Sequence, residues 1–318
     1  MRVLEDFPLS DLVYYRIGGR AKKVFEVSTV EEVKEALQIC RDEGVGKLLV
    51  LGLGSNIVIP DEGFDGAVIK LMGKGISFDV FGNKIKAFAG EAIDSLIKES
   101  FSTSLIGLEW AGGLPSSLGG AVRGNAGAFG HEMKDIFYEL EAVDMTDSHL
   151  EVKIYSKNEA NFSYRGSFFK HNPNLIILSV TVELKIGTSE EVERAEEVYR
   201  GNIEYRNLHH PMEYPSCGSV FKNIIEKEKV EKILSIWPDA RELSDSKWHH
   251  KISMGYVINR LGFSGKKVGG AMVSPKHTNY IVNIDQAKAS DIEGLISEIK
   301  NKFEAIFSFT PETEVVVI

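Results

Sequence analysis

Residues 107–130 constrain the fold of this chain more than any other stretch. The segment GLEWAGGLPSSLGGAVRGNAGAFG holds eight glycines among small side chains, so it cannot fill a hydrophobic core. Glycine adopts positive φ without steric cost and lets the main chain come close to a ligand. Pro115 suits the first turn of a short helix, whose free N–H groups favour a phosphate. The segment predicts backbone wrapped against a flat or anionic ligand; glycine turns between strands are the alternative.

A second glycine loop lies upstream. The apolar run 48–51 leads into Gly52-Leu53-Gly54-Ser55-Asn56, and residues 57–59 are apolar again. Bare N–H groups and a serine hydroxyl between two strands form an anion nest. Ile57 stands where a Rossmann fingerprint has its third glycine, and no Gly-Lys-Ser or Gly-Lys-Thr occurs. Two loops suited to phosphate, in a chain without a Rossmann fingerprint, predict a dinucleotide bound by a fold other than the Rossmann fold.

Composition narrows the class of protein. A chain of 318 residues with 43% hydrophobic and 26% charged residues is typical of a globular protein of two or three domains. The net charge of -9 argues against a nucleic-acid binder. Because the sequence shows no apolar signal core and no membrane-length apolar run, we expect a cytoplasmic protein that does not bind a membrane. Cys40 and Cys217 are too few for a disulfide framework, and no metal site is expected.

Hydrophobic periodicity predicts mixed helices and strands. Capping boxes start helices at Ser28 and Ser290, and Cys40 lies on the apolar face of the first helix. The other helices are predicted at residues 93–101, 189–207, 230–235 and 254–261. The strands are predicted at residues 24–27, 47–50, 67–71, 76–80, 84–89, 139–145, 151–155, 176–184, 219–223, 278–282 and 314–318.

The two glycine segments resemble the FAD-binding region of UDP-N-acetylenolpyruvoylglucosamine reductases, the MurB family of peptidoglycan precursor synthesis. The likeness continues through RIGG at 16–19, YRGS at 164–167, YPSCGSVFKN at 214–223 and the stretch 269–283. Several ordered motifs along almost the whole chain are more specific than any one of them.

The resemblance implies an α+β fold. It consists of an FAD-binding fold of the vanillyl-alcohol-oxidase/PCMH type with two α+β subdomains, followed by a C-terminal α+β substrate-binding domain. We place the two subdomains at residues 1–70 and 71–205 and the third part at 206–318, where the last strand can pack back on the FAD domain. The region 182–214 is short and resembles the subclass that lacks a tyrosine-bearing loop over the substrate.

The resemblance also implies the activity: NADPH-dependent reduction of UDP-N-acetylglucosamine enolpyruvate to UDP-N-acetylmuramate via FAD, which serves cell-wall biogenesis, cell shape and division. FAD is expected to be non-covalent, because Ser55 stands where covalent relatives of this fold often carry histidine. A monomer is expected. One alternative is another FAD-dependent oxidase or dehydrogenase on the same fold, which would not need the catalytic set described below. The other is a flavin- or nucleotide-binding module that is not an enzyme.

The expected cofactor-binding residues all lie in the two glycine segments. They are Gly52, Gly54, Ser55, Asn56, Gly112, Gly113, Ser116, Gly119, Gly120, Asn125, Ala126 and Gly127.

The family's catalytic residues match Arg165, Ser219 and Glu314, with Glu312 as a fallback for the glutamate. An arginine can clamp the substrate carboxylate in two bonds and stabilise the enolate, and Ser219 matches the family's proton donor. Cys217 is chemically the better acid, but the motif favours Ser219 and leaves Cys217 as packing. Tyr164, Lys222 and Asn223 are the expected substrate-binding residues.

Overall fold

The computed structural model describes residues 1–73 and 78–318, which form two compact units. Unit 1 comprises Met1–Phe7, Ala21–Gly54 and Phe64–Leu208. Unit 2 comprises Pro8–Arg20, Ser55–Gly63 and His209–Ile318. The finer division of the N-terminal part at residue 70 stays a prediction.

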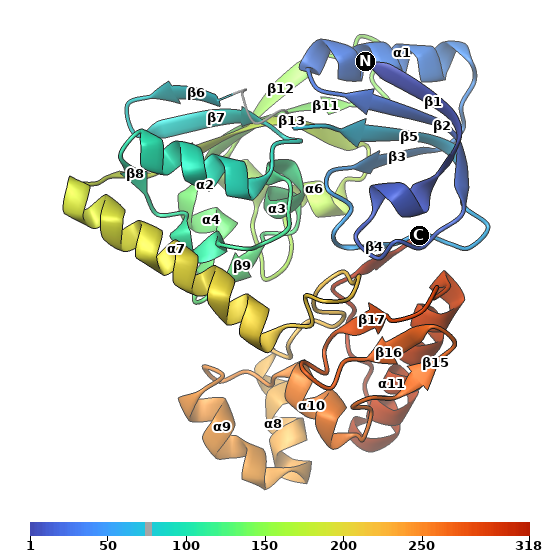
Figure 1. The fold of residues 1–318 in the computed structure, drawn as a ribbon, viewed down its shortest axis with the longest axis vertical. Helices are drawn as coiled ribbons and strands as arrows, with labels where there is room; N and C mark the ends of the chain where they lie inside the picture. The colour runs from blue at the N-terminus through green and yellow to red at the C-terminus, as the bar shows by residue number, and fades with distance from the viewer. Residues whose placement is uncertain (74–77) are drawn as a thin grey trace. The chain divides into compact units, whose positions relative to one another are not determined.

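The first sheet of unit 1 has the strand order β1-β2-β5-β3. These strands are β1 (Arg2–Pro8), β2 (Arg20–Val27), β3 (Leu48–Leu51) and β5 (Phe64–Leu71). Both β2 and β3 run parallel to β5. The helix α1 (Val30–Asp42) connects β2 to β3 and lies along one side of the sheet in Figure 1. The helix begins one residue later than the predicted box, because Thr29 is the N-cap and its side chain accepts from the Glu32 N–H. It ends before Gly44, whose φ of 68° suits glycine.

The second sheet of unit 1 is antiparallel, with the order β12-β11-β13-β7-β6. Its strands are β6 (Phe78–Phe81), β7 (Lys84–Phe88), β11 (Phe137–Asp144), β12 (Val152–Ser156) and β13 (Leu175–Glu183). Part of the strand predicted at 76–80 lies outside the described residues. Buried apolar residues of this sheet join those of the first sheet, α1 and α2 (Ile93–Ser102) in one core, which includes Cys40 as predicted.

Shorter elements complete unit 1 around the glycine-rich segment. They are β8 (Leu105–Ile106), η2 (Glu109–Ala111), α3 (Leu118–Arg123), β9 (Gly127–Ala128), β10 (His131–Glu132), α4 (Met133–Ile136), α5 (Lys157–Ala160), α6 (Phe168–His171) and β14 (Lys185–Ile186). The long helix α7 (Ser189–His209) follows.

Unit 2 has its own hydrophobic core, built mainly from the C-terminal elements. These are α8 (Lys227–Ile236), η3 (Pro238–Ala240), α9 (Arg241–Ser246), α10 (Met254–Arg260), β15 (Lys267–Val268), β16 (Ala271–Val273), β17 (Ile281–Asn283), α11 (Ala289–Phe307) and β18 (Val316–Val317). Two earlier elements, η1 (Leu9–Leu12) and β4 (Ile57–Val58), belong to the same unit. The last strand, β18, pairs in parallel with β4.

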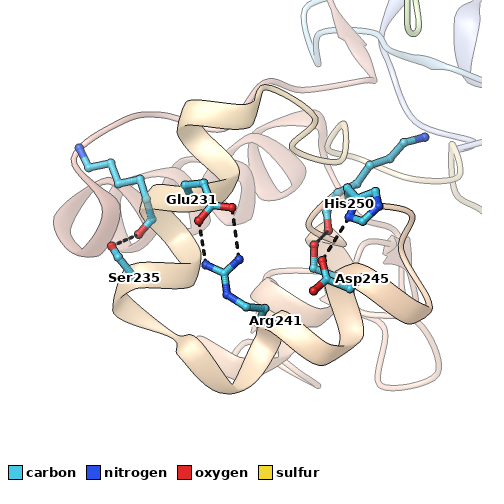
Figure 2. A network of polar contacts seen from close by, with 8 residues as sticks. Glu231, Ser235, Arg241, Asp245 and His250 are labelled. Carbon is cyan, nitrogen blue, oxygen red and sulfur yellow. Dashed lines mark hydrogen bonds and ion pairs between the residues drawn. The ribbon is translucent and has the colours of Figure 1, made fainter.

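Figure 2 shows polar contacts at the helices α8 and α9. The Arg241 guanidinium donates to both carboxylate oxygens of Glu231, at 3.3 and 2.7 Å. His250 Nδ1 lies 3.1 Å from Asp245 Oδ1. The exposed Arg241–Glu231 pair links α9 to α8, whereas the His250 contact links α9 to the loop that follows it.

Three sequence predictions in unit 2 are wrong. Residues 219–223 do not form a strand, and only single bridges occur at Phe221 and Ile224. The strand predicted at 278–282 is confined to β17, because the residues before it form the loop from β16. The last helix starts at Ala289, since the Asp291 carboxylate accepts from the Lys288 N–H and moves the cap earlier than Ser290.

Neither described stretch of the chain, 1–73 or 78–318, contains a helix long and apolar enough to cross a membrane.

Candidate active site

The loop after β3 presents unused backbone donors. Lys70 Nζ donates to the Gly52 carbonyl at 2.5 Å, and Gly54 has a φ of 69°. The backbone N–H groups of Leu53 and Gly54 donate to no residue in the described part of the chain. Neighbouring N–H groups without protein acceptors form a concave site for an anion. This part of the predicted phosphate site therefore has the chemistry it needs.

The long glycine segment reaches this loop. A Cβ atom at Gly52 would overlap the side-chain oxygen of Ser117, so only glycine allows the two chain segments to lie this close. Ser117 is the N-cap of α3, and Ser116, a predicted cofactor residue, directly precedes it. The two glycine segments are far apart in sequence, and the fold of unit 1 brings them together.

The start of α3 offers no free donors, in contrast to the expectation for this helix. The Leu118 N–H donates to Glu91 O at 2.8 Å, the Gly119 N–H to Ala89 O at 2.9 Å, and the Gly120 N–H to Ser117 Oγ at 3.3 Å. Pro115 is also not in the first turn, because it precedes the N-cap by two residues. The expectation of free donors at this helix start is thus wrong, because its first N–H groups are already bonded within the protein.

Asn125 fastens the end of the glycine segment to a neighbouring turn. It is fully buried, and its side chain donates to Ser163 O at 2.9 Å and to Glu132 Oε2 at 3.1 Å. Its Oδ1 accepts from the Lys134 N–H at 3.0 Å. These three bonds occupy the amide, so its side chain supports the shape of the segment.

Arg165 lies in the turn that Asn125 holds. Ser163 and Gly166 exchange backbone hydrogen bonds of 3.0 and 3.1 Å, which leaves Tyr164 and Arg165 between them. Arg165 has a φ of 55°, an uncommon conformation for a residue with a side chain. Its Nη2 donates to Gly127 O at 2.7 Å, and the guanidinium lies 5.2 Å from the Tyr164 ring centre. Thus the structure brings together four predicted site residues of unit 1.

The remaining predicted cofactor residues have mixed surroundings. Gly112 O accepts from Arg206 Nε at 2.8 Å, and a Cβ at Gly112 would lie 2.6 Å from Tyr199 O. Gly113 has a φ of 73°, and the Ala126 N–H donates to Ala121 O. Ser55 and Asn56 belong to unit 2, where Asn56 Nδ2 donates to Glu314 O at 3.1 Å.

In unit 2, the structure brings the segments of Ser219 and Glu314 together. The Glu314 N–H donates to Val220 O at 2.7 Å, and Phe221 forms a bridge with Thr313. Ser219 is half-buried, and its hydroxyl makes no hydrogen bond within residues 1–73 or 78–318. A hydroxyl without a protein partner is available to a substrate.

Contacts distinguish the two candidate glutamates. Glu312 is exposed and its carboxylate accepts from Lys222 Nζ at 2.8 Å. Glu314 is half-buried and lies opposite Val220, next to Ser219. This placement favours Glu314 over Glu312. Asn223 uses its Oδ1 to accept from the Met254 N–H at 3.0 Å, which fixes the start of α10.

Cys217 is a buried packing residue. Its Sγ donates to Ile57 O at 3.2 Å, and burial raises the pKa of this thiol to about 12. Gly218, with a φ of 74°, turns the chain between Cys217 and Ser219, so the two side chains do not share the strand face that a regular strand would give them. Its burial and its bond to Ile57 O fit a packing residue.

Sequence reasoning missed two cations of unit 1. Lys70 is 7% exposed, and burial lowers the pKa of its ammonium from 10.5 to about 8. The sequence does contain a feature that could have identified Lys70: it is the single charged residue in the otherwise apolar run 67–71. Arg123 is half-buried, and desolvation lowers the pKa of its guanidinium.

Across residues 1–73 and 78–318, no group of three or more His, Cys, Asp or Glu side chains could hold a metal ion.

Comparisons with known proteins cover almost the whole chain. The family model described as "FAD binding domain" matches residues 21–153, and that described as "UDP-N-acetylenolpyruvoylglucosamine reductase, C-terminal domain" matches residues 210–318. These matches confirm the predicted fold class, an α+β FAD-binding fold with a C-terminal α+β domain.

Full-length relatives agree with these matches. A UDP-N-acetylenolpyruvoylglucosamine reductase of Enterococcus faecalis is 33% identical over 99% of this chain and 94% of its own length. One of Synechococcus sp. strain CC9311 is 31% identical over 98% of this chain and 91% of its own length. The crystal structure of the Thermus caldophilus enzyme matches with a TM-score of 0.74 and 30% identity, over 99% of this chain and 98% of that one.

Proposed function

The chain belongs to the UDP-N-acetylenolpyruvoylglucosamine reductase family, and we propose that it reduces UDP-N-acetylglucosamine enolpyruvate to UDP-N-acetylmuramate. It is an FAD-dependent oxidoreductase of peptidoglycan precursor synthesis. The structural observation that carries the proposal is the meeting of the two glycine segments, at Gly52 and Ser117, beside a loop with unused N–H groups.

The residues of unit 1 fit an FAD diphosphate. The N–H groups of Leu53 and Gly54 would bind its oxygens, and the buried Lys70 adds positive charge directly beneath the loop. When bound, FAD carries two electrons from NADPH to the double bond of the substrate. No side chain of this loop is suited to a covalent link, so we propose that FAD is held non-covalently.

Arg165 is proposed to bind the carboxylate of the enolpyruvyl group. Its bond to Gly127 O sets the plane of the guanidinium. A planar cation held in place can stabilise negative charge that develops on the carboxylate side of the substrate as its double bond is reduced. Tyr164, stacked against this guanidinium, is proposed to contact the same substrate.

Ser219 is proposed to deliver the proton that completes the reduced substrate. Its hydroxyl is uncommitted and lies beside the Glu314 segment, so the carboxylate of Glu314 is the group we propose to assist the proton transfer. Lys222 and Asn223 are proposed to contact the substrate as well.

We further propose that NADPH rather than NADH is the electron donor, that the protein acts in the cytoplasm, where NADPH and UDP-sugars are metabolites, and that it is a monomer. Through its product the reaction would support cell shape and division.

The purified protein tests this proposal directly. We expect a yellow, acid-releasable flavin that NADPH bleaches and that UDP-N-acetylglucosamine enolpyruvate recolours under exclusion of oxygen. A flavin that is recoloured by oxygen but not by this substrate would contradict the proposal and favour an FAD-dependent oxidase.

The same spectra test the residue roles. In Arg165→Ala, NADPH should still reduce the flavin at close to the wild-type rate. Reoxidation of the flavin by the enolpyruvyl substrate should be slower by orders of magnitude, because negative charge develops next to the substrate carboxylate only in this second step. Equal slowing of both steps would instead mark Arg165 as a folding or flavin residue.

A further inference from the structure

Asn279 is bonded on three sides to the two residues that follow Ser219. Its main-chain oxygen accepts from the Val220 N–H at 2.8 Å. Its side-chain Oδ1 accepts from the Phe221 N–H at 3.0 Å, and its Nδ2 donates to Phe221 O at 2.9 Å. The residue is 3% exposed. The buried Asn279 side chain therefore makes the bonds to the Phe221 backbone that a neighbouring strand would make. Residues 219–223, which the sequence predicts as a strand, do not form one.

The opposite side of this short segment is held by the C-terminal end of the chain. Val220 O accepts from the Glu314 N–H at 2.7 Å, and the Lys222 N–H donates to Glu312 O at 3.0 Å. Residues 220–222 are thus clamped between Asn279 and the segment that carries Glu314.

Ser219 is less constrained on its N-terminal side. Gly218 precedes it with a φ of 74°, and a Cβ atom added at Gly218 would meet nothing within 4 Å. A glycine in open space restrains its neighbour weakly. The bonds made by the residues after Ser219 therefore contribute directly to the position of its hydroxyl.

Asn279 lies in the loop between β16 and β17, and hydrogen bonds hold this loop in place. The Ser274 N–H donates to Tyr280 O at 2.8 Å and closes this loop. The Asn279 N–H donates to His277 Nδ1 at 3.3 Å, and Thr278 Oγ1 donates to Gly255 O at 2.5 Å. The loop can act as a fixed support for the segment beside it.

We propose that Asn279 is a positioning residue for Ser219: by binding both polar groups of the Phe221 backbone, it sets where the Ser219 hydroxyl delivers its proton. The proposal rests on the role proposed for Ser219. A proton donor works only within hydrogen-bond reach of its target, and a displacement of about 1 Å can cost on the order of 10²-fold in rate.

The chain offers a matched control four residues later. Asn283 is also buried, at 9% exposed. Its Oδ1 accepts from the Ala287 N–H at 2.9 Å and its Nδ2 donates to Tyr15 O at 3.0 Å. It makes the same kinds of side-chain bond in the same unit, but neither goes to residues 219–222.

Stopped-flow absorbance of the flavin in the holoenzyme compares the two asparagines. Asn279→Ala should be reduced by NADPH at the wild-type rate and reoxidised by the enolpyruvyl substrate on the order of 10²-fold more slowly. Asn283→Ala should lose a similar amount of thermal stability while both half-reactions stay close to wild type. Equal slowing of reoxidation in the two variants would overturn the proposal, because loss of any buried asparagine would then suffice.

Asn279→Asp keeps the test informative where Asn279→Ala fails to fold. Aspartate retains an acceptor for the Phe221 N–H but sets a second oxygen against Phe221 O in place of the donor, so slowed reoxidation is expected here too. Wild-type reoxidation in a folded Asn279→Asp protein would contradict a positioning role for the side-chain donor.

A double-mutant cycle separates this proposal from the role of Ser219. If Asn279 acts through Ser219, Asn279→Ala should slow reoxidation little further in a Ser219→Ala background. Full additivity, with Ser219→Ala itself slow, would overturn the proposal for Asn279 alone. Wild-type reoxidation by Ser219→Ala would instead refute the role of Ser219, and the positioning role would fall with it.

Discussion

In the loop after β3, glycines leave backbone N–H groups without protein acceptors, whereas in residues 107–130 they mainly let chain segments pack closely. Leu53 and Gly54 donate to no described residue. Gly119, in contrast, donates to Ala89 O, and a Cβ there would lie 2.8 Å from the Ala89 Cβ. The denser glycine segment thus has fewer free donors at its helix than the short loop has.

This difference shows that glycine content alone does not identify a binding site. A glycine can be required because a ligand approaches, because another chain segment approaches, or because the backbone needs positive φ. The hydrogen-bond partner of each N–H group decides between these causes.

The largest effect is expected at the point where the two segments meet. Gly52→Ala should give flavin-free protein, because the new methyl group would overlap the Ser117 oxygen and force the loop away from α3. Flavin content per folded protein, measured by absorbance after gel filtration, checks this. Gly46→Ala is the matched control, since a Cβ there meets nothing within 4 Å. Full flavin occupancy in Gly52→Ala would show that the contact between the segments is dispensable for binding.

The buried cation beneath the loop should make stability depend on pH. The folded protein holds the Lys70 pKa at about 8, below its ordinary 10.5, so the unfolded state binds more protons between these values. The stability of the flavin-free protein should therefore rise from about pH 8 to about pH 10.5, by up to about 3 kcal/mol from this group. In Lys70→Met this part of the rise should vanish. Urea denaturation of both proteins across this pH range measures it, and identical slopes would refute the assignment.

Gly119→Ala should affect packing and leave flavin binding nearly unchanged. The methyl group would press on Ala89, which overpacks the core and costs about 1–3 kcal/mol. Because the Gly119 N–H is already bonded to Ala89 O, the folded variant should retain its flavin. Chemical denaturation and flavin titration measure the two effects separately. Gly124→Ala, where the nearest atom would be 3.5 Å away, serves as control. Loss of flavin without loss of stability in Gly119→Ala would reverse the assignment.

The smallest effect is expected for a glycine with neither role. Gly201 lies inside α7, and a Cβ there meets nothing within 4 Å. Gly201→Ala should stabilise the protein by up to about 1 kcal/mol, because alanine favours a helix. A small rise in the thermal midpoint checks this, and destabilisation would reveal a contact that only glycine allows.

The local sequence pattern is enough to predict most elements of this protein. Apolar spacing placed α1, α2 and α7 and every strand of the two sheets of unit 1 except β1 within a few residues, because periodicity is a property of neighbouring residues. Ordered motifs along the chain were enough to predict the family and the FAD-binding fold. Cys40 and Cys217 were correctly predicted as packing residues.

Only the tertiary structure decided which backbone groups of these segments remain free. The first N–H groups of α3 bond to Glu91 and Ala89, which lie more than 25 residues earlier in the sequence. No local sequence pattern predicts such partners. For the same reason the run 219–223, with its strand-like composition, forms no strand: the Asn279 side chain and residues 312–314 occupy its hydrogen-bonding groups. Hydrophobic periodicity depends only on residues that are close in sequence, whereas the partner of a hydrogen bond depends on which segments the fold brings together.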